Sequence, residues 1–172
     1  MIHRIALFAL LLVTSWTVMV VTHECGHLIG GLLGGATLTE VDLAPWRLPY
    51  SLHSPDPLPL VTLWAGPIVG VLIPVLVAAI CRRLWVWFIA DFCMLANGVY
   101  LALAWISGDR FLDTPRLLAA GAPPVTIVIY CVLTMGLGYW WFRSDCARCL
   151  WSVPADPKRG NGGDCVPRGD VR

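Results

Sequence analysis

His23, Glu24 and His27 stand in the pentapeptide HECGH, which places two imidazoles and one carboxylate close together in the chain. On a helix, residues i and i+4 share a face, so both imidazoles can point the same way. Two imidazoles at this spacing can bind one Zn²⁺, with the intervening glutamate within reach of a water molecule on the metal. Zinc lowers the pKa of such a water from about 15.7 to about 7, and Glu24 would act as the base that takes its proton.

The surroundings of this motif are strongly apolar. Of the 172 residues, 58% are hydrophobic and only 13% are charged, whereas a soluble domain has about 25% charged residues. The formal net charge of +1 gives no indication of nucleic acid as a partner. Ionisable side chains are costly inside a membrane, and a bound cation would offset the charge of Glu24. The composition therefore predicts a membrane protein and favours a metal site.

Four apolar runs are long enough to cross a bilayer as helices, since about 20 residues span its hydrocarbon core. They cover about residues 5–33, 60–80, 84–106 and 125–142. Between the first two runs, residues 34–60 contain several prolines and the alternating stretch TLTEVDL, which indicates a short strand or hairpin. We therefore expect an all-α integral membrane protein with about four transmembrane helices and a hairpin-like segment between the first two.

The composition changes after the fourth run. Residues 1–143 are predicted to form a membrane-embedded core that carries the metal site, and residues 144–172, rich in Gly, Pro, Asp and Arg, a flexible hydrophilic tail. The tail contains Cys146, Cys149 and Cys165, too few ligands for a structural zinc site. Lipidation, a disulfide and no particular role all stay open for these thiols.

A catalytic zinc usually has three protein ligands and a water, so a third ligand is needed. Adjacent spans run in opposite directions, which places the C-terminal ends of the first and third spans on one side. Asp109 directly follows the apolar part of the third span and is the first candidate. Asp113 lies one helical turn further on and is the second. Asp91 lies in the first half of that span, nearer the opposite face, and is the third.

Three motifs, within about residues 18–115, resemble the site-2 protease family of intramembrane zinc metalloproteases, in the family's order. HECGH matches the family's His-Glu-x-Gly-His. AGPIVGVLIPVL, from Ala65, resembles the Ala-Gly-Pro segment that opens the next core span, and SGD at 107–109 resembles the aspartate motif that ends the third. Many members carry Asn-x-x-Pro and then Leu-Asp-Gly, whereas Asn97 here lacks the proline. No PDZ-like insert is present, as in the compact members.

The resemblance implies a zinc metalloendopeptidase, with His23, His27 and Asp109 as zinc ligands and Glu24 as catalytic base. It implies a multi-pass protein of the cell membrane that cuts transmembrane segments of other proteins in or beside the lipid bilayer. It also implies that the 36–60 segment presents a substrate strand by edge pairing. The sequence gives no indication of an oligomeric state.

Two other functions stay open on the same residues. One is a non-catalytic membrane protein that keeps the fold and the metal. The other is a small ion transporter that uses His23, Glu24 and His27 as a relay, although no repeated halves or paired broken helices support it.

Two arguments give opposite orientations in the membrane. Arg4, Arg82, Arg83 and Arg143 lie on one side of the predicted spans, and the positive-inside rule assigns this side and the N-terminus to the cytoplasm. The family resemblance implies a site nearer the cytoplasm and hence an external N-terminus. We adopt the family's arrangement as the expectation.

Overall fold

The computed structural model describes residues 2–47 and 49–151, which form five helices and two strands. In chain order these are α1 (Ile2–Gly34), β1 (Leu38–Asp42), β2 (Tyr50–His53), α2 (Pro59–Cys81), α3 (Leu84–Ser107), α4 (Asp113–Ala119) and α5 (Pro124–Trp151). Four of the helices, α1, α2, α3 and α5, are long and apolar enough to cross a membrane. The predicted set of four long helices with a hairpin between the first two is confirmed.

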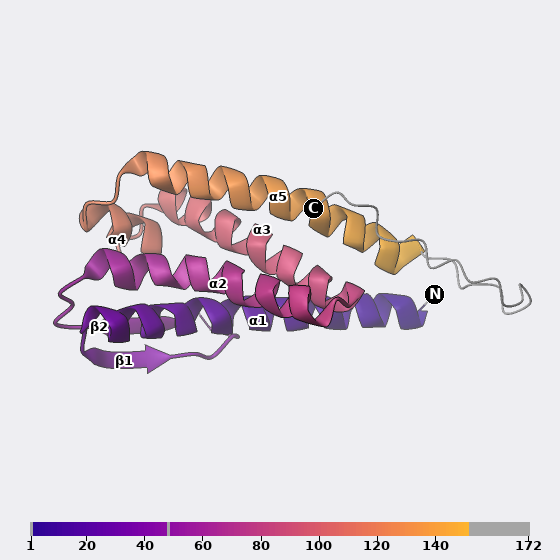
Figure 1. Cartoon of the computed structure of the whole chain (residues 1–172), viewed down its shortest axis with the longest axis horizontal. Helices are drawn as coiled ribbons and strands as arrows, with labels where there is room; N and C mark the ends of the chain where they lie inside the picture. Colours follow the sequence, from indigo (N-terminus) through magenta and orange to yellow (C-terminus); the bar gives the residue numbers. More distant parts are fainter. Residues whose placement is uncertain (1, 48, 152–172) are drawn as a thin grey trace, which may run out of the picture.

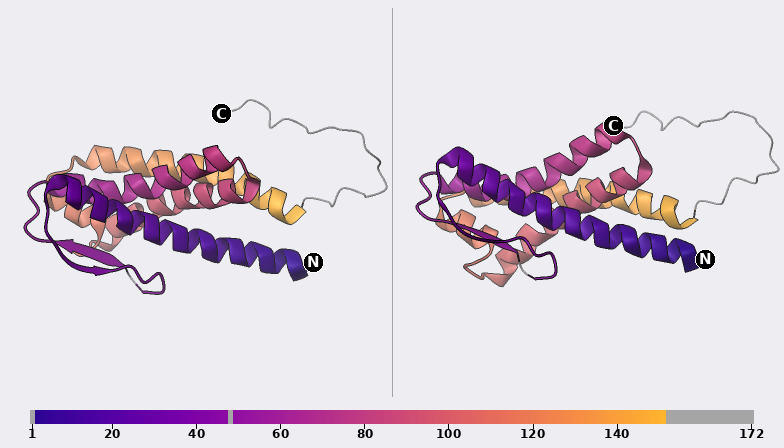
Figure 2. Two further views of the ribbon diagram at one scale, coloured as in Figure 1. Left: turned by 60° about the horizontal axis from the view of Figure 1, so that its bottom comes forward. Right: turned by 90° about the horizontal axis from the view of Figure 1, so that it is seen from below.

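The four long helices run along the long axis of the molecule, with α4 and the hairpin at one end (Figure 1). α1 packs mainly on α2, and α3 packs mainly on α5. The N-terminus and the turn between α2 and α3 lie at the other end, as all three ribbon views show (Figures 1 and 2). The end of α1 that carries HECGH therefore lies beside the hairpin and α4.

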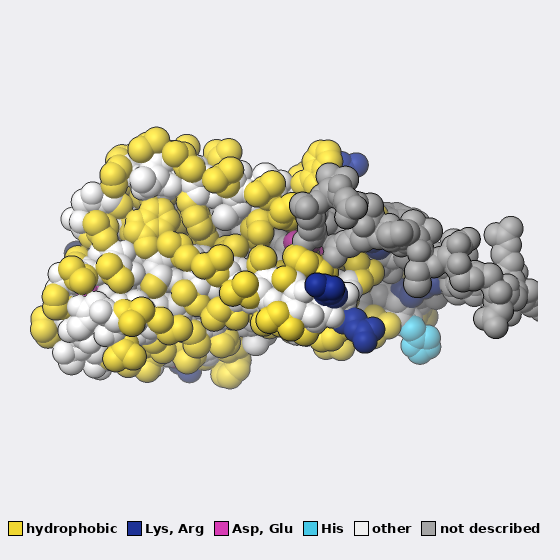
Figure 3. All heavy atoms as spheres, in the orientation of Figure 1, with side chains coloured by type: hydrophobic (Ala, Val, Ile, Leu, Met, Phe, Trp, Pro, Cys, Tyr) yellow, Lys and Arg dark blue, Asp and Glu magenta, His cyan; other side chains and the backbone are white. Residues whose placement is uncertain are grey.

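The outer faces of the long helices are apolar. Large hydrophobic side chains such as Leu7, Leu76 and Trp140 are exposed on α1, α2 and α5. Figure 3 shows this apolar surface over the length of the molecule, with several basic side chains near the end that holds the N-terminus. Exposed apolar surface of this extent is unusual on a soluble monomer and suits contact with lipid.

Local chain geometry sets two of the helix ends. Arg82 is left-handed, with φ of 53°, and its N–H donates to the Ala78 carbonyl, which ends α2. Gly108, with φ of 66°, ends α3 in the same way, with its N–H on the Ala104 carbonyl. The first turn is tight and makes α2 and α3 antiparallel. After the second, the chain passes through residues 109–112 into α4.

The hairpin lies against the C-terminal half of α1. β1 and β2 are antiparallel, with Val41 opposite Ser51. The indole N–H of Trp16 on α1 donates to the Pro45 carbonyl oxygen at 3.1 Å. The His53 ring lies against Gly31, where any side chain would overlap it. These contacts hold β2 next to the HECGH motif.

Close packing of α1 on α2 depends on glycine. A methyl group on Gly26 would overlap the Ala65 carbonyl oxygen, and one on Gly66 would overlap the His27 ring. The Ala-Gly-Pro segment at 65–67 therefore lies directly against HECGH. Its glycine leaves room for an imidazole of the motif.

We expect Gly26→Ala to lower the free energy of unfolding by about 1–3 kcal/mol, because the two helices must separate to admit the methyl group. Gly136→Ala on α5 is the matched control, since a methyl there meets nothing within 4 Å. Its higher helix propensity should leave stability unchanged or raise it by about 0.5–1 kcal/mol. Thermal unfolding in detergent measures both, and equal stability of the two variants would contradict the packing.

α5 continues beyond the predicted end of the fourth span near Phe142. The Ser144 hydroxyl donates to the Trp140 carbonyl, and Arg148 pairs with Asp145 at 3.3 Å within the helix. These local interactions carry the helix through polar residues that composition alone assigns to the tail. Cys146 and Cys149 are therefore helical and half-buried, whereas Cys165 and the rest of the predicted tail lie outside the described residues.

Candidate metal centre

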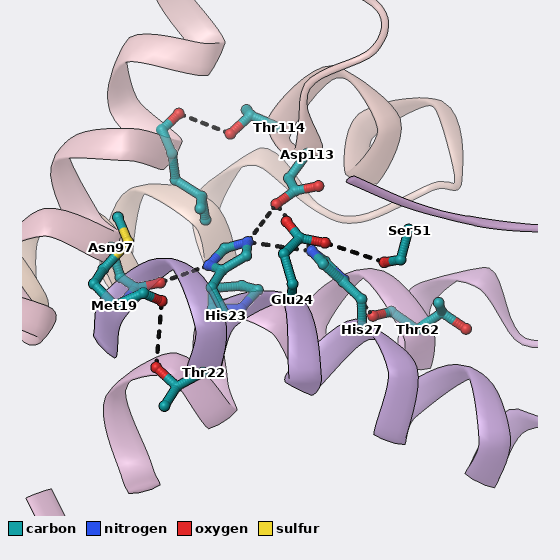
Figure 4. Close-up of polar contacts among 12 residues, drawn as sticks. Met19, Thr22, His23, Glu24, His27, Ser51, Thr62, Asn97, Asp113 and Thr114 are labelled. Atoms are coloured by element: carbon teal, nitrogen blue, oxygen red, sulfur yellow. Dashed lines mark hydrogen bonds and ion pairs between the residues drawn. The ribbon is translucent and has the colours of Figure 1, made fainter. Parts of the chain in front are cut away.

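The last turns of α1 carry His23, Glu24 and His27 into the interior (Figure 4). All three are buried, with 4%, 7% and 4% of their surface exposed. One ligand atom from each lies within 4.8 Å of those of the other two. The i, i+4 spacing brings the two rings together, with their centroids 4.9 Å apart.

Asp113, at the start of α4, supplies the carboxylate that contacts both imidazoles (Figure 4). Its Oδ2 lies 2.8 Å from Nε2 of His23 and 3.2 Å from Nε2 of His27. The two Nε2 atoms are 3.2 Å apart. A tetrahedral zinc ion with bonds of about 2.0–2.1 Å separates its ligand atoms by about 3.3 Å. The three atoms therefore have nearly the spacing that one small cation needs.

The other nitrogen of each ring is already engaged. Nδ1 of His23 lies 2.7 Å from Oδ1 of Asn97, and Nδ1 of His27 lies 2.9 Å from the Thr62 carbonyl oxygen. An amide or carbonyl oxygen only accepts, so each Nδ1 carries the hydrogen and Nε2 keeps its lone pair in the neutral ring. The Asn97 Nδ2 donates to the Cys93 carbonyl, which turns Oδ1 towards His23. Metal-binding histidines typically have such outer hydrogen bonds.

Three lone pairs thus converge on one point. Two neutral imidazole nitrogens and a carboxylate oxygen repel at this distance unless a cation or added protons lie among them. Burial by itself would raise the pKa of the Asp113 carboxyl, but the positive charges of the His27 and His23 rings, when these are protonated, outweigh it and hold this pKa well below its usual range. Asp113 is therefore an anion at neutral pH. Two imidazole nitrogens with one carboxylate oxygen are a donor set of catalytic zinc sites.

Glu24 lies beside these three atoms, on the same helix. Its Oε2 accepts a hydrogen bond of 3.2 Å from the hydroxyl of Ser51 on β2 (Figure 4). Ser51 is itself buried, with 3% of its surface exposed. The hairpin therefore contacts the one carboxylate of the group that is free to act as a base.

Glu24 lines two cavities. The first, of about 240 Å³, is called the polar chamber here after the polar and charged residues among its lining, which include Glu24, His27, Glu40, Ser51, Asp113 and Arg116. The apolar chamber, of about 290 Å³, is bounded by Trp16, Met19, Val20, His23, Glu24 and Arg47, among others. Pro49 and Tyr100 line both. The Glu24 carboxylate therefore adjoins open space in both cavities.

The structure does not bring Asp109, the first candidate for third ligand, to the histidines. Asp109 is exposed, and its Oδ1 accepts a hydrogen bond from the Phe111 N–H at 3.0 Å. Gly108 ends α3 just before it, and the left-handed turn leaves Asp109 on the outside of the loop. The second candidate, Asp113, takes the place predicted for Asp109.

Asp91, the third candidate, also stays away from the histidines. It is fully buried on α3, two residues before Cys93, whose Sγ lies 3.8 Å from the Ser15 carbonyl oxygen. Asp91 therefore lies near the depth of Ser15 on α1, about two helical turns from His23.

α4 is the element that positions Asp113. The Thr114 hydroxyl donates to the Leu101 carbonyl at 2.7 Å and fastens the start of α4 to α3 (Figure 4). Leu112-Asp113 matches the first two residues of the family's Leu-Asp-Gly, a signal that could have favoured Asp113 over Asp109. No sequence signal pointed to Ser51 as the partner of Glu24.

Asn97 is best understood as the residue that orients His23, since both ends of its amide are engaged inside the protein. We expect Asn97→Ala to weaken zinc affinity about 10–100-fold, the usual effect of losing such a partner. Asn97→Asp retains an acceptor for Nδ1 and is expected to bind zinc more tightly than Asn97→Ala. Competition with a zinc chelator measures both affinities, and an unchanged affinity in Asn97→Ala would contradict this role.

Comparison with protein-family models, with curated proteins and with solved structures gave no significant match. The described residues themselves define the class. They form four helices able to cross a membrane, around a buried group of two histidines and two carboxylates.

Proposed function

We propose that the protein is a membrane-embedded zinc metalloendopeptidase, a hydrolase that cleaves peptide bonds in or near transmembrane segments of other proteins. The observation that carries the proposal is the convergence of Nε2 of His23, Nε2 of His27 and Oδ2 of Asp113, with both Nδ1 hydrogens already donated. Glu24 lies beside them, and it forms no ion pair with a lysine or arginine among the described residues. These are the parts that metal-assisted hydrolysis requires.

His23, His27 and Asp113 would hold the ion. Asp113 thus replaces Asp109 in the ligand set that the resemblance implies. A bound zinc ion supplies a positive charge that acidifies water and polarises a peptide carbonyl. Glu24 takes the proton from the attacking water and passes it to the nitrogen of the leaving amine. The Ser51 hydroxyl orients the Glu24 carboxylate through Oε2 and leaves Oε1 for this proton.

The long apolar helices support a multi-pass location in a membrane, for which we propose the cell membrane. They also support membrane-embedded substrates, because both chambers adjoin helices whose outer faces are apolar. The group lies where α1 meets the hairpin and α4, through Ser51 and Asp113. The arrangement in which the end with the hairpin and α4 faces the cytoplasm stays part of the proposal.

Removal of the metal tests the function. Purified protein in detergent should cleave a synthetic transmembrane peptide, lose this activity with 1,10-phenanthroline and regain it with one equivalent of Zn²⁺ per chain. Zinc binding without cleavage of any membrane peptide would favour a non-catalytic binder. Metal or proton flux in vesicles, without cleavage, would favour a transporter.

A further inference from the structure

The apolar chamber has walls that suit a hydrocarbon side chain. Trp16, Met19 and Val20 of α1 form one side, and Pro49 and Tyr100 close it. Met19 and Val20 are buried, with 6% and 4% of their surface exposed. A volume of about 290 Å³ accommodates a residue such as Leu or Phe with its adjoining backbone.

The chamber opens at the outer face of the molecule. The Trp16 side chain lies at this edge, with 48% of the residue exposed, and the Arg47 side chain is 67% exposed. The hydrogen bond from Trp16 to Pro45 joins α1 to the loop before β2 across the same edge. A membrane segment could therefore enter from the lipid side.

The inner end of the chamber reaches the reacting groups. His23 and Glu24 line it, and Glu24 also lines the polar chamber on the other side. The Tyr100 ring lies edge-on to His23, with centroids 5.3 Å apart, and forms part of both walls. A side chain held against Met19 and Val20 would thus place its own backbone beside Glu24.

We infer that the apolar chamber is a substrate side-chain subsite, which selects a large apolar residue next to the bond that is cleaved. This inference rests on the proposed endopeptidase function. The occupant is a residue of the substrate rather than a lipid chain, because His23 and Glu24 line the inner end of the chamber and suit a peptide backbone better than a hydrocarbon chain. Discrimination between large and small apolar residues in such a pocket is typically about 10–200-fold.

The test uses one synthetic transmembrane peptide in detergent, with each residue around the cleaved bond changed in turn to Ala, Leu or Phe. At one of these positions, the wild type should cleave the Leu and Phe peptides with kcat/KM at least about tenfold above that of the Ala peptide. Val20→Phe narrows the chamber and should remove this preference. Met19→Ala widens it and should shift the preference from Leu towards Phe. Val13→Phe, on the exposed face of the same helix, is the matched control and should keep the wild-type ratios.

A second measurement does not depend on cleavage. In the Glu24→Gln variant, a short peptide hydroxamate with a benzyl side chain should raise the melting temperature more than one with a methyl side chain. Adding Val20→Phe should abolish this difference, and adding Val13→Phe should preserve it.

The outcomes separate the inference from the function. Cleavage with equal rates for Ala, Leu and Phe at every position, or equal effects of Val20→Phe and Val13→Phe, would overturn the subsite and leave the endopeptidase standing. Lipid occupancy of the chamber would give this same result. No cleavage by the wild type, together with no hydroxamate stabilisation, would overturn both.

Discussion

Glu24→Gln is expected to lower peptide-bond hydrolysis at least about a hundredfold while the protein keeps its zinc. The amide has nearly the size and shape of the carboxylate and can still accept the hydrogen bond from Ser51. It cannot take a proton from water, and general-base catalysis contributes about 10²–10⁴-fold to rate. Cleavage of a synthetic transmembrane peptide measures the rate, and metal analysis of the same sample measures zinc.

The retained zinc separates this prediction from simple misfolding. A variant with both activity and metal lost would make Glu24 a structural or ligating residue. A variant with full activity and full metal would exclude Glu24 as the base and would end the proposed mechanism.

Asp113→Ala is expected to lower zinc affinity by more than about a hundredfold and to abolish hydrolysis. Loss of a residue that merely supports a ligand costs about 10–100-fold, so loss of a direct ligand should cost more. The substitution also removes the one carboxylate that contacts both buried imidazoles directly.

Asp109→Ala is the matched control for Asp113→Ala. It removes a carboxylate of the same kind from an exposed loop residue. The hydrogen bond of that carboxylate is to the N–H of Phe111, two residues further on. Zinc affinity and hydrolysis should stay at wild-type values. The reverse result, with metal lost from Asp109→Ala and kept by Asp113→Ala, would contradict the site described here.

The helical framework was predictable because each long helix is a continuous apolar run. Each apolar run is long enough to cross a bilayer as a helix, and this length identified all four long helices. The alternation in TLTEVDL indicated the strand that is β1 in the structure. The juxtaposition of His23 and His27 followed from helical periodicity alone, since both lie on one helix. Features set by a single element are readable from local sequence.

The third carboxylate was not predictable by the same reasoning. Because adjacent spans run in opposite directions, the sequence predicted that the end of α3 lies on the same side as the end of α1. It did not predict where the chain turns after α3. The left-handed Gly108 and the bond from Thr114 to Leu101 decide that Asp113 faces the histidines and Asp109 faces outwards. Which aspartate faces the histidines therefore depends on the path of a loop of only a few residues. A shift of one helical turn in that loop would bury one aspartate and expose the other.

The contact between Ser51 and Glu24 was hidden for a similar reason. Ser51 and Glu24 belong to different elements, so helical periodicity does not relate them. Ser51 reaches the site because contacts at Trp16 and Gly31 hold the hairpin against α1. The end of α5 was predicted too early because Ser144 bonds the Trp140 carbonyl and Arg148 pairs with Asp145, so that polar residues continue the helix. Amino-acid composition gives no information about such local interactions.

X-ray absorption at the zinc edge, on purified protein loaded with Zn²⁺, tests the central claim most directly. We predict one zinc per chain with only nitrogen and oxygen neighbours at about 2.0–2.2 Å, including the scattering pattern of two imidazoles. The signal should be lost in Asp113→Ala and kept in Asp109→Ala. A protein that takes up no zinc, or a zinc ion bound by cysteine sulfur at about 2.3 Å, would contradict the account.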